Sequence, residues 1–160
     1  MPLFYSECNK VLSHSGTIAI WGYGNFVFSK YPELTKLHHE YSTKFLKSYW
    51  EPGRNHLVDL YQDQSFIVSP YFTMERYVFP DQDKDPILEV EWSLAQIEGY
   101  LKTWSAYQSF KKQRPDDPDP ISRFVGSVKG ILKTDSMDTR LHIYWPIGMI
   151  LGKRSSSFNE

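Results

Sequence analysis

The sequence predicts an α/β fold, and two observations along its 160 residues carry that prediction. Between Phe4 and Gly24, a segment with helical periodicity, a tight turn, a strand and a glycine-containing loop follow one another. After Gly24, segments with helical and with strand periodicity continue to alternate, as expected for helices that cover a sheet. The opening therefore corresponds to half of a βαβ unit, and the remainder supplies elements that extend it.

The opening segment supplies the strand that organises the rest of the chain. A helix comes first, because its apolar residues recur at helical spacing: Phe4, Cys8, Val11 and Leu12. Gly16 then makes the turn into residues 17–21, a strand with little alternation, which is typical of a parallel sheet covered on both faces. Gly22 and Gly24 let the backbone turn where this strand ends.

Two helices are predicted in the next part of the chain. The first covers residues 32–49 and begins with Pro32 and Glu33, which favour a first helical turn. Its apolar face is formed by Leu34, Leu37, Tyr41, Phe45 and Tyr49. After Pro52 and Gly53 end it, a short second helix directs three residues inward: Leu57, Leu60 and Tyr61.

Residues 71–79 and 87–92 alternate between two kinds of side chain, so each is predicted to form a strand, with a polar turn at residues 81–86 between them. Ser93 and Gln96 then form a capping box, which begins a helix over residues 93–112. The inner side of this helix carries Ile97, Tyr100, Leu101, Trp104 and Phe110.

The chain closes with a helix and a strand. The helix follows a loop rich in proline and aspartate, and its apolar face holds Ile121, Phe124, Val125, Val128, Ile131 and Leu132. The last strand covers residues 139–150, with Pro146 breaking its hydrogen-bond ladder. The chain from Lys153 onward is expected to fray. We therefore divide the sequence into one domain, residues 1–154, and a tail, residues 155–160.

Composition narrows the class of protein. The net charge of −1 gives no electrostatic footprint for nucleic acid, and a hydrophobic content of 41% is enough for a core. One cysteine, Cys8, excludes an internal disulfide framework and a cysteine-rich zinc site. The longest apolar run, residues 145–151, is too short to span a bilayer, and the N-terminus lacks a basic leader before an apolar stretch. We therefore expect a cytoplasmic protein without membrane or nucleic-acid partners.

Several motifs that would indicate a cofactor or a metal are incomplete. Gly22 and Gly24 lack the third glycine and the following acid of a dinucleotide-binding loop, so a flexible strand exit is the simpler interpretation. The five histidines include no pair four residues apart, and no metal site is predicted. Glu89 and Glu91 share a strand face, where they form either a carboxylate pair or, more simply, a solvated surface.

Arg54 is a candidate for binding an anion. It follows an aromatic corner, residues 48–53, at a helix boundary, and arginine can hold a carboxylate through two parallel hydrogen bonds. The alternative is a surface arginine without a specific partner. Trp104 and Tyr107 lie within a predicted helix, where core packing is the alternative to a role in a pocket. The aromatic content of 16% fits either a concave site or ordinary packing.

Three segments together resemble a known family. Residues 16–23 (GTIAIWGY), 49–54 (YWEPGR) and 102–107 (KTWSAY) are similar to segments of trans-aconitate methyltransferases and related class I S-adenosylmethionine-dependent methyltransferases of fungi. Their order and spacing match as well. The resemblance extends from the opening helix to residues 151–154 and is loosest at residues 116–138.

The resemblance implies an α/β fold that corresponds to the C-terminal half of a Rossmann-like methyltransferase domain. The family sheet has seven strands, is mostly parallel and ends in an antiparallel strand. On that template residues 17–23 form the fifth strand, the sixth comes from residues 71–92, and residues 139–150 form the seventh. The helices at residues 32–49 and 93–112 would roof the substrate pocket.

The resemblance also implies the chemistry. The family uses S-adenosylmethionine, but it binds this cofactor with a glycine-rich loop, an acid and other residues after earlier strands, none of which lie in this chain. No cofactor-binding or catalytic residue is therefore assigned here. The implied function is methyl transfer to a small carboxylate-bearing substrate, with Arg54 holding the carboxylate. The pocket wall is expected to consist of Trp21, Tyr23, Trp50, Arg54, Trp104 and Tyr107.

The missing first half has a physical consequence for partners and activity. A strand that should be central would keep a free edge with unpaired N–H and C=O groups, and covering helices would show apolar faces. We therefore expect a homodimer, or pairing with a separately encoded N-terminal half, and no autonomous activity. The alternatives are a non-catalytic remnant, a pairing subunit of another methyltransferase, or an unrelated module that binds a small ligand.

Overall fold

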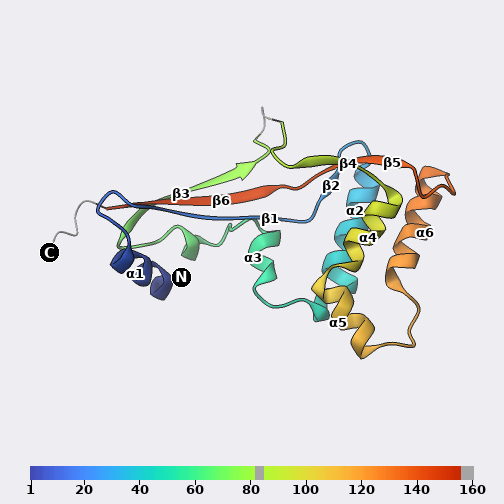
Figure 1. Ribbon diagram of the computed structural model, residues 1–160, viewed down its shortest axis with the longest axis horizontal. Helices are drawn as coiled ribbons and strands as arrows, with labels where there is room; N and C mark the ends of the chain where they lie inside the picture. Colours follow the sequence, from blue (N-terminus) through green and yellow to red (C-terminus); the bar gives the residue numbers. More distant parts are fainter. Residues whose placement is uncertain (82–84, 156–160) are drawn as a thin grey trace. The chain divides into compact units, whose positions relative to one another are not determined.

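The computed structural model describes residues 1–81 and 85–155, and it confirms the predicted α/β class (Figure 1). The described chain divides into two compact units. The long-strand unit combines residues 1–24, residues 55–87 and the chain from residue 146 onward. The helix-rich unit combines residues 25–54 and 88–145.

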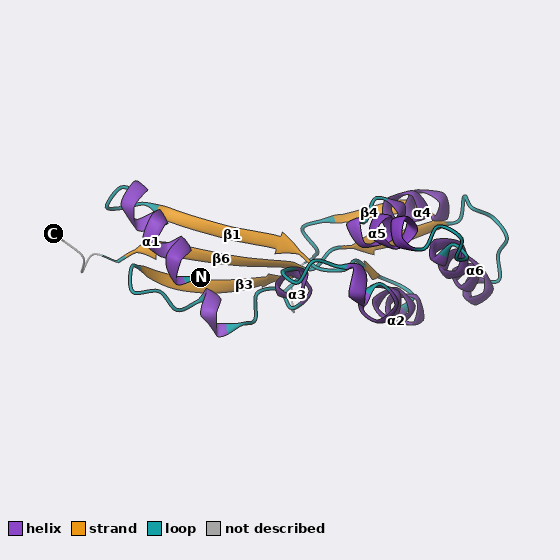
Figure 2. Ribbon diagram, turned by 90° about the horizontal axis from the view of Figure 1, so that it is seen from below, coloured by secondary structure: helices purple, strands orange, loops and turns teal. Residues whose placement is uncertain are grey.

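The long-strand unit is built on a three-stranded sheet in the order β1 (Thr17–Tyr23), β6 (Ile147–Arg154) and β3 (Phe72–Phe79) (Figure 2). Both neighbours of β6 run antiparallel to it, so β1 and β3 point in the same direction. This arrangement agrees with the template, in which the last strand is antiparallel to the others. Of the two predicted strands within residues 71–92, only β3 lies in the sheet of β1 among the described residues.

The predicted parallel pairing of residues 17–21 is wrong for the described residues, because every described strand pair is antiparallel. The apolar and polar residues of this segment do not alternate in the sequence, yet the strand is not buried on both faces. Burial itself alternates along β1, since Ile18 is buried whereas Ala19 and Trp21 are exposed. One face of this strand is therefore covered by its own unit, and the other carries apolar side chains in the open.

The helix-rich unit contains a second antiparallel sheet, in the order β2 (Val27–Phe28), β5 (Arg140–Tyr144) and β4 (Glu89–Ser93). The predicted strand at residues 87–92 thus exists, but it lies outside the sheet of β1. The predicted last strand is two strands, because Pro146 lacks an N–H and separates β5 from β6.

Strand β6 continues to Arg154, so the fraying predicted from Lys153 is wrong for Lys153 and Arg154. The Arg154 N–H donates to the Gly16 carbonyl at 3.1 Å, and the Ser155 N–H donates to the Tyr71 carbonyl at 2.9 Å. The rest of the predicted tail, residues 156–160, lies outside the described residues, as do residues 82–84 of the predicted turn.

Helix α1 (Pro2–Val11) buries Tyr5. Of the four apolar residues that predicted this helix, Cys8 and Leu12 pack partly buried against the cluster of Tyr5, whereas Phe4 and Val11 are exposed. The Tyr5 hydroxyl donates to the Phe66 carbonyl at the end of a 3-10 turn (Gln64–Phe66). The spacing therefore predicted the helix and two of its packed residues correctly. It passed over Tyr5, an aromatic ring that needs one polar partner.

Gly22 was predicted to turn the chain at the end of β1. It lies instead within the strand, where its missing side chain leaves room for Leu57. It lies opposite Gly148 of β6, and a Cβ on Gly22 would come within 2.5 Å of Leu57 Cδ2. A Cβ on Gly148 would come within 2.8 Å of the Leu60 carbonyl oxygen. Helix α3 (Arg54–Val58) ends before Leu60, whose backbone is left-handed with a φ of 51°. The chain at Leu60 therefore lies close against the sheet.

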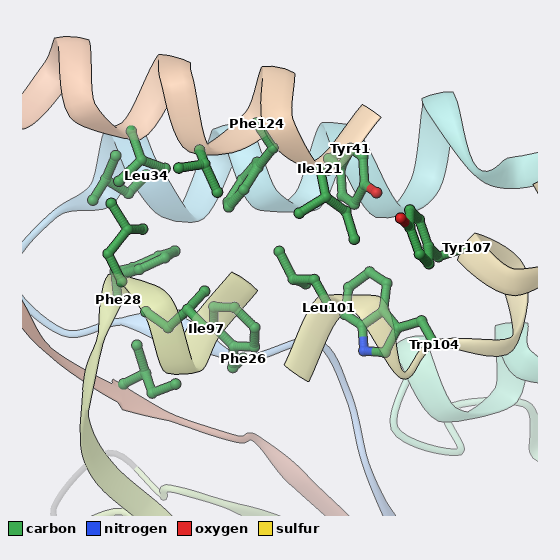
Figure 3. Close-up of a cluster of buried hydrophobic side chains, with 14 of the residues drawn as sticks. Phe26, Phe28, Leu34, Tyr41, Ile97, Leu101, Trp104, Tyr107, Ile121 and Phe124 are labelled. Carbon is green, nitrogen blue, oxygen red and sulfur yellow. The ribbon is translucent and has the colours of Figure 1, made fainter. Parts of the chain in front are cut away.

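The helix-rich unit carries α2 (Pro32–Glu40), α4 (Leu94–Lys102), α5 (Ser105–Gln113) and α6 (Pro120–Leu132). The predicted helix at residues 93–112 breaks at Thr103, while the predicted capping box of Ser93 and Gln96 is present. Side chains from these helices and from the segment around β2 meet in one apolar core (Figure 3): Phe26, Phe28, Leu34, Ile97, Leu101, Ile121 and Phe124. No helix within the described residues is long and apolar enough to cross a membrane.

The predicted helix at residues 32–49 changes type at its centre. After α2 comes a π-helical turn (Tyr41–Phe45), and then a 3-10 turn (Lys47–Tyr49). The wider turn shifts the sequence relative to the helix face, so Leu46 is buried and Phe45 is 44% exposed, contrary to the prediction for Phe45. Single π-helical turns occur frequently at functional sites.

Candidate functional site

Arg54, at the start of α3, lies at the centre of the candidate site. Its guanidinium carbon lies 3.9 Å from the centre of the Trp50 ring and 5.8 Å from that of Trp104. The two tryptophan rings contact each other, with centroids 5.2 Å apart. An arginine stacked on tryptophan is a favourable cation–π arrangement. The structure thus brings together three predicted site residues: Trp50, Arg54 and Trp104.

Two further polar side chains hold the guanidinium. Arg54 Nη2 donates to Asn25 Oδ1 and, at 2.9 Å, to Ser42 Oγ. Ser42 Oγ donates in turn to Asn25 Oδ1 at 3.2 Å, and Trp50 Nε1 donates to the Ser42 carbonyl at 2.9 Å. Because arginine only donates hydrogen bonds, the oxygen of the Asn25 amide must face it. We call these five residues (Asn25, Ser42, Trp50, Arg54 and Trp104) the Arg54 cluster.

The other nitrogens of the guanidinium have no partner among the described residues. Arg54 Nη1 and Nε make no hydrogen bond within the described part of the chain, and none of the described ion pairs includes Arg54. Burial lowers the pKa of Arg54 to about 10, which leaves it charged at neutral pH. A partly buried cation without an acid partner is costly, and a bound anion would stabilise it.

His38 of α2 lies beside this cluster and is fully buried. Its Nδ1 donates to the Phe26 carbonyl oxygen at 3.1 Å, and its ring stacks on Phe26 with centroids 3.8 Å apart. Its Nε2 has no hydrogen-bond partner among the described residues. Burial lowers the pKa of His38 to about 3, with a smaller contribution from the Arg54 charge. The ring is therefore neutral near pH 7 and contributes packing rather than proton transfer.

Asn25, Ser42 and His38 are absent from the site predicted from the sequence. Asn25 follows Gly24 in the glycine-containing loop, which is the one signal that the sequence offers for it. Ser42 reaches Arg54 from the π-helical turn, a shape that side-chain periodicity does not reveal. These residues join the site only because the fold brings separate segments together.

The other predicted site residues lie elsewhere. Tyr107 is buried in α5, and its hydroxyl donates to Oδ2 of Asp119, the N-terminal cap of α6, at 3.2 Å. Trp21, which is 63% exposed, and Tyr23 stand on β1 in the long-strand unit. The role of these three residues in a substrate pocket stays a prediction, because the hydrogen bonds and ring contacts of Arg54 described above come from other residues of the helix-rich unit.

Glu89 and Glu91 have different surroundings. Glu89 Oε2 lies 3.1 Å from His142 Nε2, and Ser29 Oγ lies 2.7 Å from His142 Nδ1. This row crosses the second sheet, and all its side chains are at least partly exposed, so it forms a surface network. Within the described residues, no group of three His, Cys, Asp or Glu side chains is arranged to hold a metal ion.

Curated proteins with similar sequences are named as methyltransferases. One, from Dictyostelium discoideum, is named as an inferred methyltransferase and is 28% identical over 156 residues, which cover 96% of this chain and 55% of the relative. Another is CRG1 of Saccharomyces cerevisiae, named as an inferred S-adenosylmethionine-dependent methyltransferase. It is 20% identical over 156 residues, which cover 88% of this chain and 54% of the relative. No family model matches the chain.

A solved structure shares the fold. It is an inferred type II methyltransferase from Anaeromyxobacter dehalogenans, with a TM-score of 0.61 and 22% identity over 86% of this chain and 52% of that one. At this identity the match establishes the fold alone. The comparisons do not reach the trans-aconitate type, which stays a prediction. The chain thus has the fold of part of a methyltransferase, and it spans about half the length of relatives named as methyltransferases.

Proposed function

We propose that this chain contributes the acceptor-binding part of an S-adenosylmethionine-dependent methyltransferase whose substrate is a small molecule with a carboxylate. Sequence similarity to proteins named as methyltransferases supports the reaction class. Arg54 supports a substrate with a carboxylate, because its guanidinium is charged, partly buried and without an acid partner among the described residues.

The Arg54 cluster is suited to hold a carboxylate in one orientation. Asn25 and Ser42 fix Nη2, and the Trp50 ring restricts the plane of the guanidinium. A carboxylate that meets the remaining N–H groups would receive charge-assisted hydrogen bonds, which are about twice as strong as neutral ones. The neighbouring tryptophan rings limit the access of water and strengthen such bonds. Binding and orienting the acceptor is therefore what these residues contribute to methyl transfer.

The charge of the Arg54 cluster does not identify it as the cofactor site. S-adenosylmethionine carries a sulfonium cation, which the Arg54 guanidinium would repel, and a carboxylate, which the guanidinium would attract. We therefore assign no cofactor-binding residue to this chain. We propose S-adenosylmethionine as the cofactor of the whole enzyme, since CRG1 is named as dependent on it.

Calorimetric titration of the full chain with trans-aconitate tests the assignment of Arg54. We expect saturable binding and at least a roughly tenfold loss of affinity in Arg54→Gln, since a hydrogen bond to a charged group contributes about 1.5–3 kcal/mol. Lys112→Gln removes an exposed cation outside the cluster and should bind as the wild type does. The uncharged trimethyl ester should not bind. Equal affinities of Arg54→Gln and the wild type would remove Arg54 from substrate binding.

A second candidate function is that of a non-catalytic pairing subunit, and the edge of β1 favours it. Within the described residues, β1 pairs with β6 on one edge and with no strand on the other. Trp21 is exposed on this edge strand. Unpaired strand edges and exposed apolar side chains are surfaces for association. The partner would be a second copy of the chain or another methyltransferase, to which this chain would lend a substrate lid.

Carboxylate binding separates these candidates. The acceptor-binding part should bind trans-aconitate through Arg54, whereas a non-catalytic pairing subunit should associate without binding this ligand. Sedimentation velocity of the purified chain should show a dimer if it pairs with itself, and Trp21→Lys should then shift the chain toward the monomer. Heat of S-adenosylmethionine binding by the chain alone would count against both candidates and would support an autonomous enzyme.

A further inference from the structure

The helix-rich unit contains a hollow that lies apart from the Arg54 cluster. A groove of about 470 Å³ opens between the π-helical turn and α6, and we call it the outer groove. Its described lining residues include no member of the Arg54 cluster. The volume falls within the range of about 300–1,000 Å³ that small-molecule sites occupy. The groove is therefore large enough for a ligand of its own.

The floor of the outer groove is aromatic. Tyr41 and Phe45 stack with centroids 6.0 Å apart and an interplanar angle of 9°, and Phe124 of α6 lies 5.4 Å from Tyr41 (Figure 3). The π-helical turn creates this floor, because it leaves Phe45 partly exposed while Leu46 takes the buried position. Removing apolar surface from water is favourable, so a ligand that covers Phe45 would be favoured.

The rim of the outer groove carries an unneutralised cation. Lys44 is paired with Glu40 at 3.0 Å, so the charges of these two side chains offset each other. Arg123 of α6 takes part in none of the ion pairs among the described residues. An adjoining hollow of about 360 Å³ also borders Phe45 and Arg123. The outer groove is therefore apolar along its floor and positive at its edge.

We propose that the outer groove binds a flat aromatic molecule with one carboxylate. The aromatic ring would lie against Phe45 and Tyr41, where stacking and apolar burial favour it, and the carboxylate would meet Arg123. This ligand differs from the proposed acceptor in place and in chemistry. The Arg54 guanidinium is partly buried and held by Asn25 and Ser42, whereas the Arg123 side chain is exposed above an open aromatic floor.

Nitrogen-15 NMR of the full chain tests this site with 2-naphthoate, and 2-naphthalenemethanol serves as the matched neutral molecule. We expect saturable shifts of the Phe45, Phe124 and Ser127 amides. Because Arg123 is exposed, the affinity for the carboxylate should exceed that for the alcohol by roughly three- to tenfold. Arg123→Gln should remove this preference and leave the binding of the alcohol unchanged.

Two control variants keep the test specific. Lys112→Gln removes an exposed cation that does not border the groove, and it should keep the preference for the carboxylate. Arg54→Gln should keep the preference as well, which distinguishes the outer groove from the proposed acceptor site. Unchanged amide spectra of the free variants would verify their folding. Equal affinities of the wild type for the two molecules, shifts centred on Trp50, or no shifts at all would overturn the proposal.

Discussion

The two units of this chain bury their apolar side chains to very different extents. In the helix-rich unit, one continuous core joins α2, α4, α5 and α6. In the long-strand unit, the buried side chains form two small clusters, one around Tyr5 and one around Ile150. Trp21 and Tyr77 of its sheet remain exposed. The helix-rich unit therefore has one continuous apolar core, whereas the sheet of the long-strand unit leaves apolar side chains exposed.

This difference indicates which unit is suited to bind the acceptor and which is suited to associate with another chain. A continuous core can hold Asn25, Ser42 and Trp104 in fixed positions around Arg54, as a preorganised binding site requires. An edge strand with exposed apolar side chains offers a surface to another chain. We therefore expect acceptor recognition in the helix-rich unit and association through the long-strand unit.

The largest expected effect comes from the core of the helix-rich unit. Leu101→Ala removes a fully buried side chain of α4 and should lower the free energy of unfolding by about 2–5 kcal/mol. Ile18→Ala, in a small cluster of the long-strand unit, should cost less, because fewer buried side chains surround it. Urea denaturation of the two variants measures the contrast. An equal loss of unfolding free energy in both variants would contradict the difference in packing between the two units.

A smaller effect is expected where the chain lies against the long sheet. Gly148→Ala would place a Cβ within 2.8 Å of the Leu60 carbonyl oxygen, and a backbone atom yields little, so stability should fall by about 1–3 kcal/mol. Gly126→Ala in α6 is the matched control, because no heavy atom lies within 4 Å of its added Cβ. The control should stabilise the protein by up to about 1 kcal/mol. Thermal denaturation measures the stability of both variants. A Gly148→Ala variant as stable as the wild type would contradict the close packing inferred at Leu60.

Acid should weaken the helix-rich unit through His38. Its pKa is about 3 in the folded chain because of burial, against 6.5 for an exposed histidine, so the unfolded chain binds more protons between these values. The stability from this group is complete above pH 6.5 and is lost as the pH falls, by about 2 kcal/mol at pH 5. Denaturation of the wild type and His38→Phe at pH 7 and pH 5 measures the loss. The variant cannot titrate there and should lose less, whereas parallel losses would argue against a buried neutral His38.

The smallest effect is expected at the surface network of the helix-rich unit. Glu89→Gln removes the charge beside His142 and should change the free energy of unfolding by less than about 1 kcal/mol, since exposed ion pairs contribute little. Glu91→Gln on the same strand is the control for removing a negative charge. Urea denaturation compares the two variants. A loss of several kcal/mol in the free energy of unfolding of Glu89→Gln alone would contradict the assignment of this network to the surface.

Local signals in the sequence predicted the positions of helices and strands better than the pairing of strands in sheets. The capping box of Ser93 and Gln96 marks the start of α4, and both partners lie within one helical turn. The placement of β4 in the second sheet depends on its pairing with β5, which lies far along the chain, and no local pattern encodes this pairing. The π-helical turn at Tyr41–Phe45 shifts a helix face without a sequence signature, so Phe45 was placed inside.

The same distinction applies to the candidate site. Trp50 and Arg54 lie in one aromatic corner of the sequence, and their proximity could be predicted from it. Asn25 lies 29 residues from Arg54 and Ser42 lies 12 residues away, so only the fold brings them to the guanidinium. The sequence could therefore indicate the anion-binding residue, but not the side chains that hold it in place.

Hydrogen–deuterium exchange of the chain, with and without trans-aconitate, tests most directly whether recognition lies in the helix-rich unit and association in the other. We predict slow exchange in α4 and α6, faster exchange along β1, and ligand protection confined to the segments of the Arg54 cluster. Protection of β1 equal to that of α4, or ligand protection that arises outside that cluster, would contradict this division between the two units.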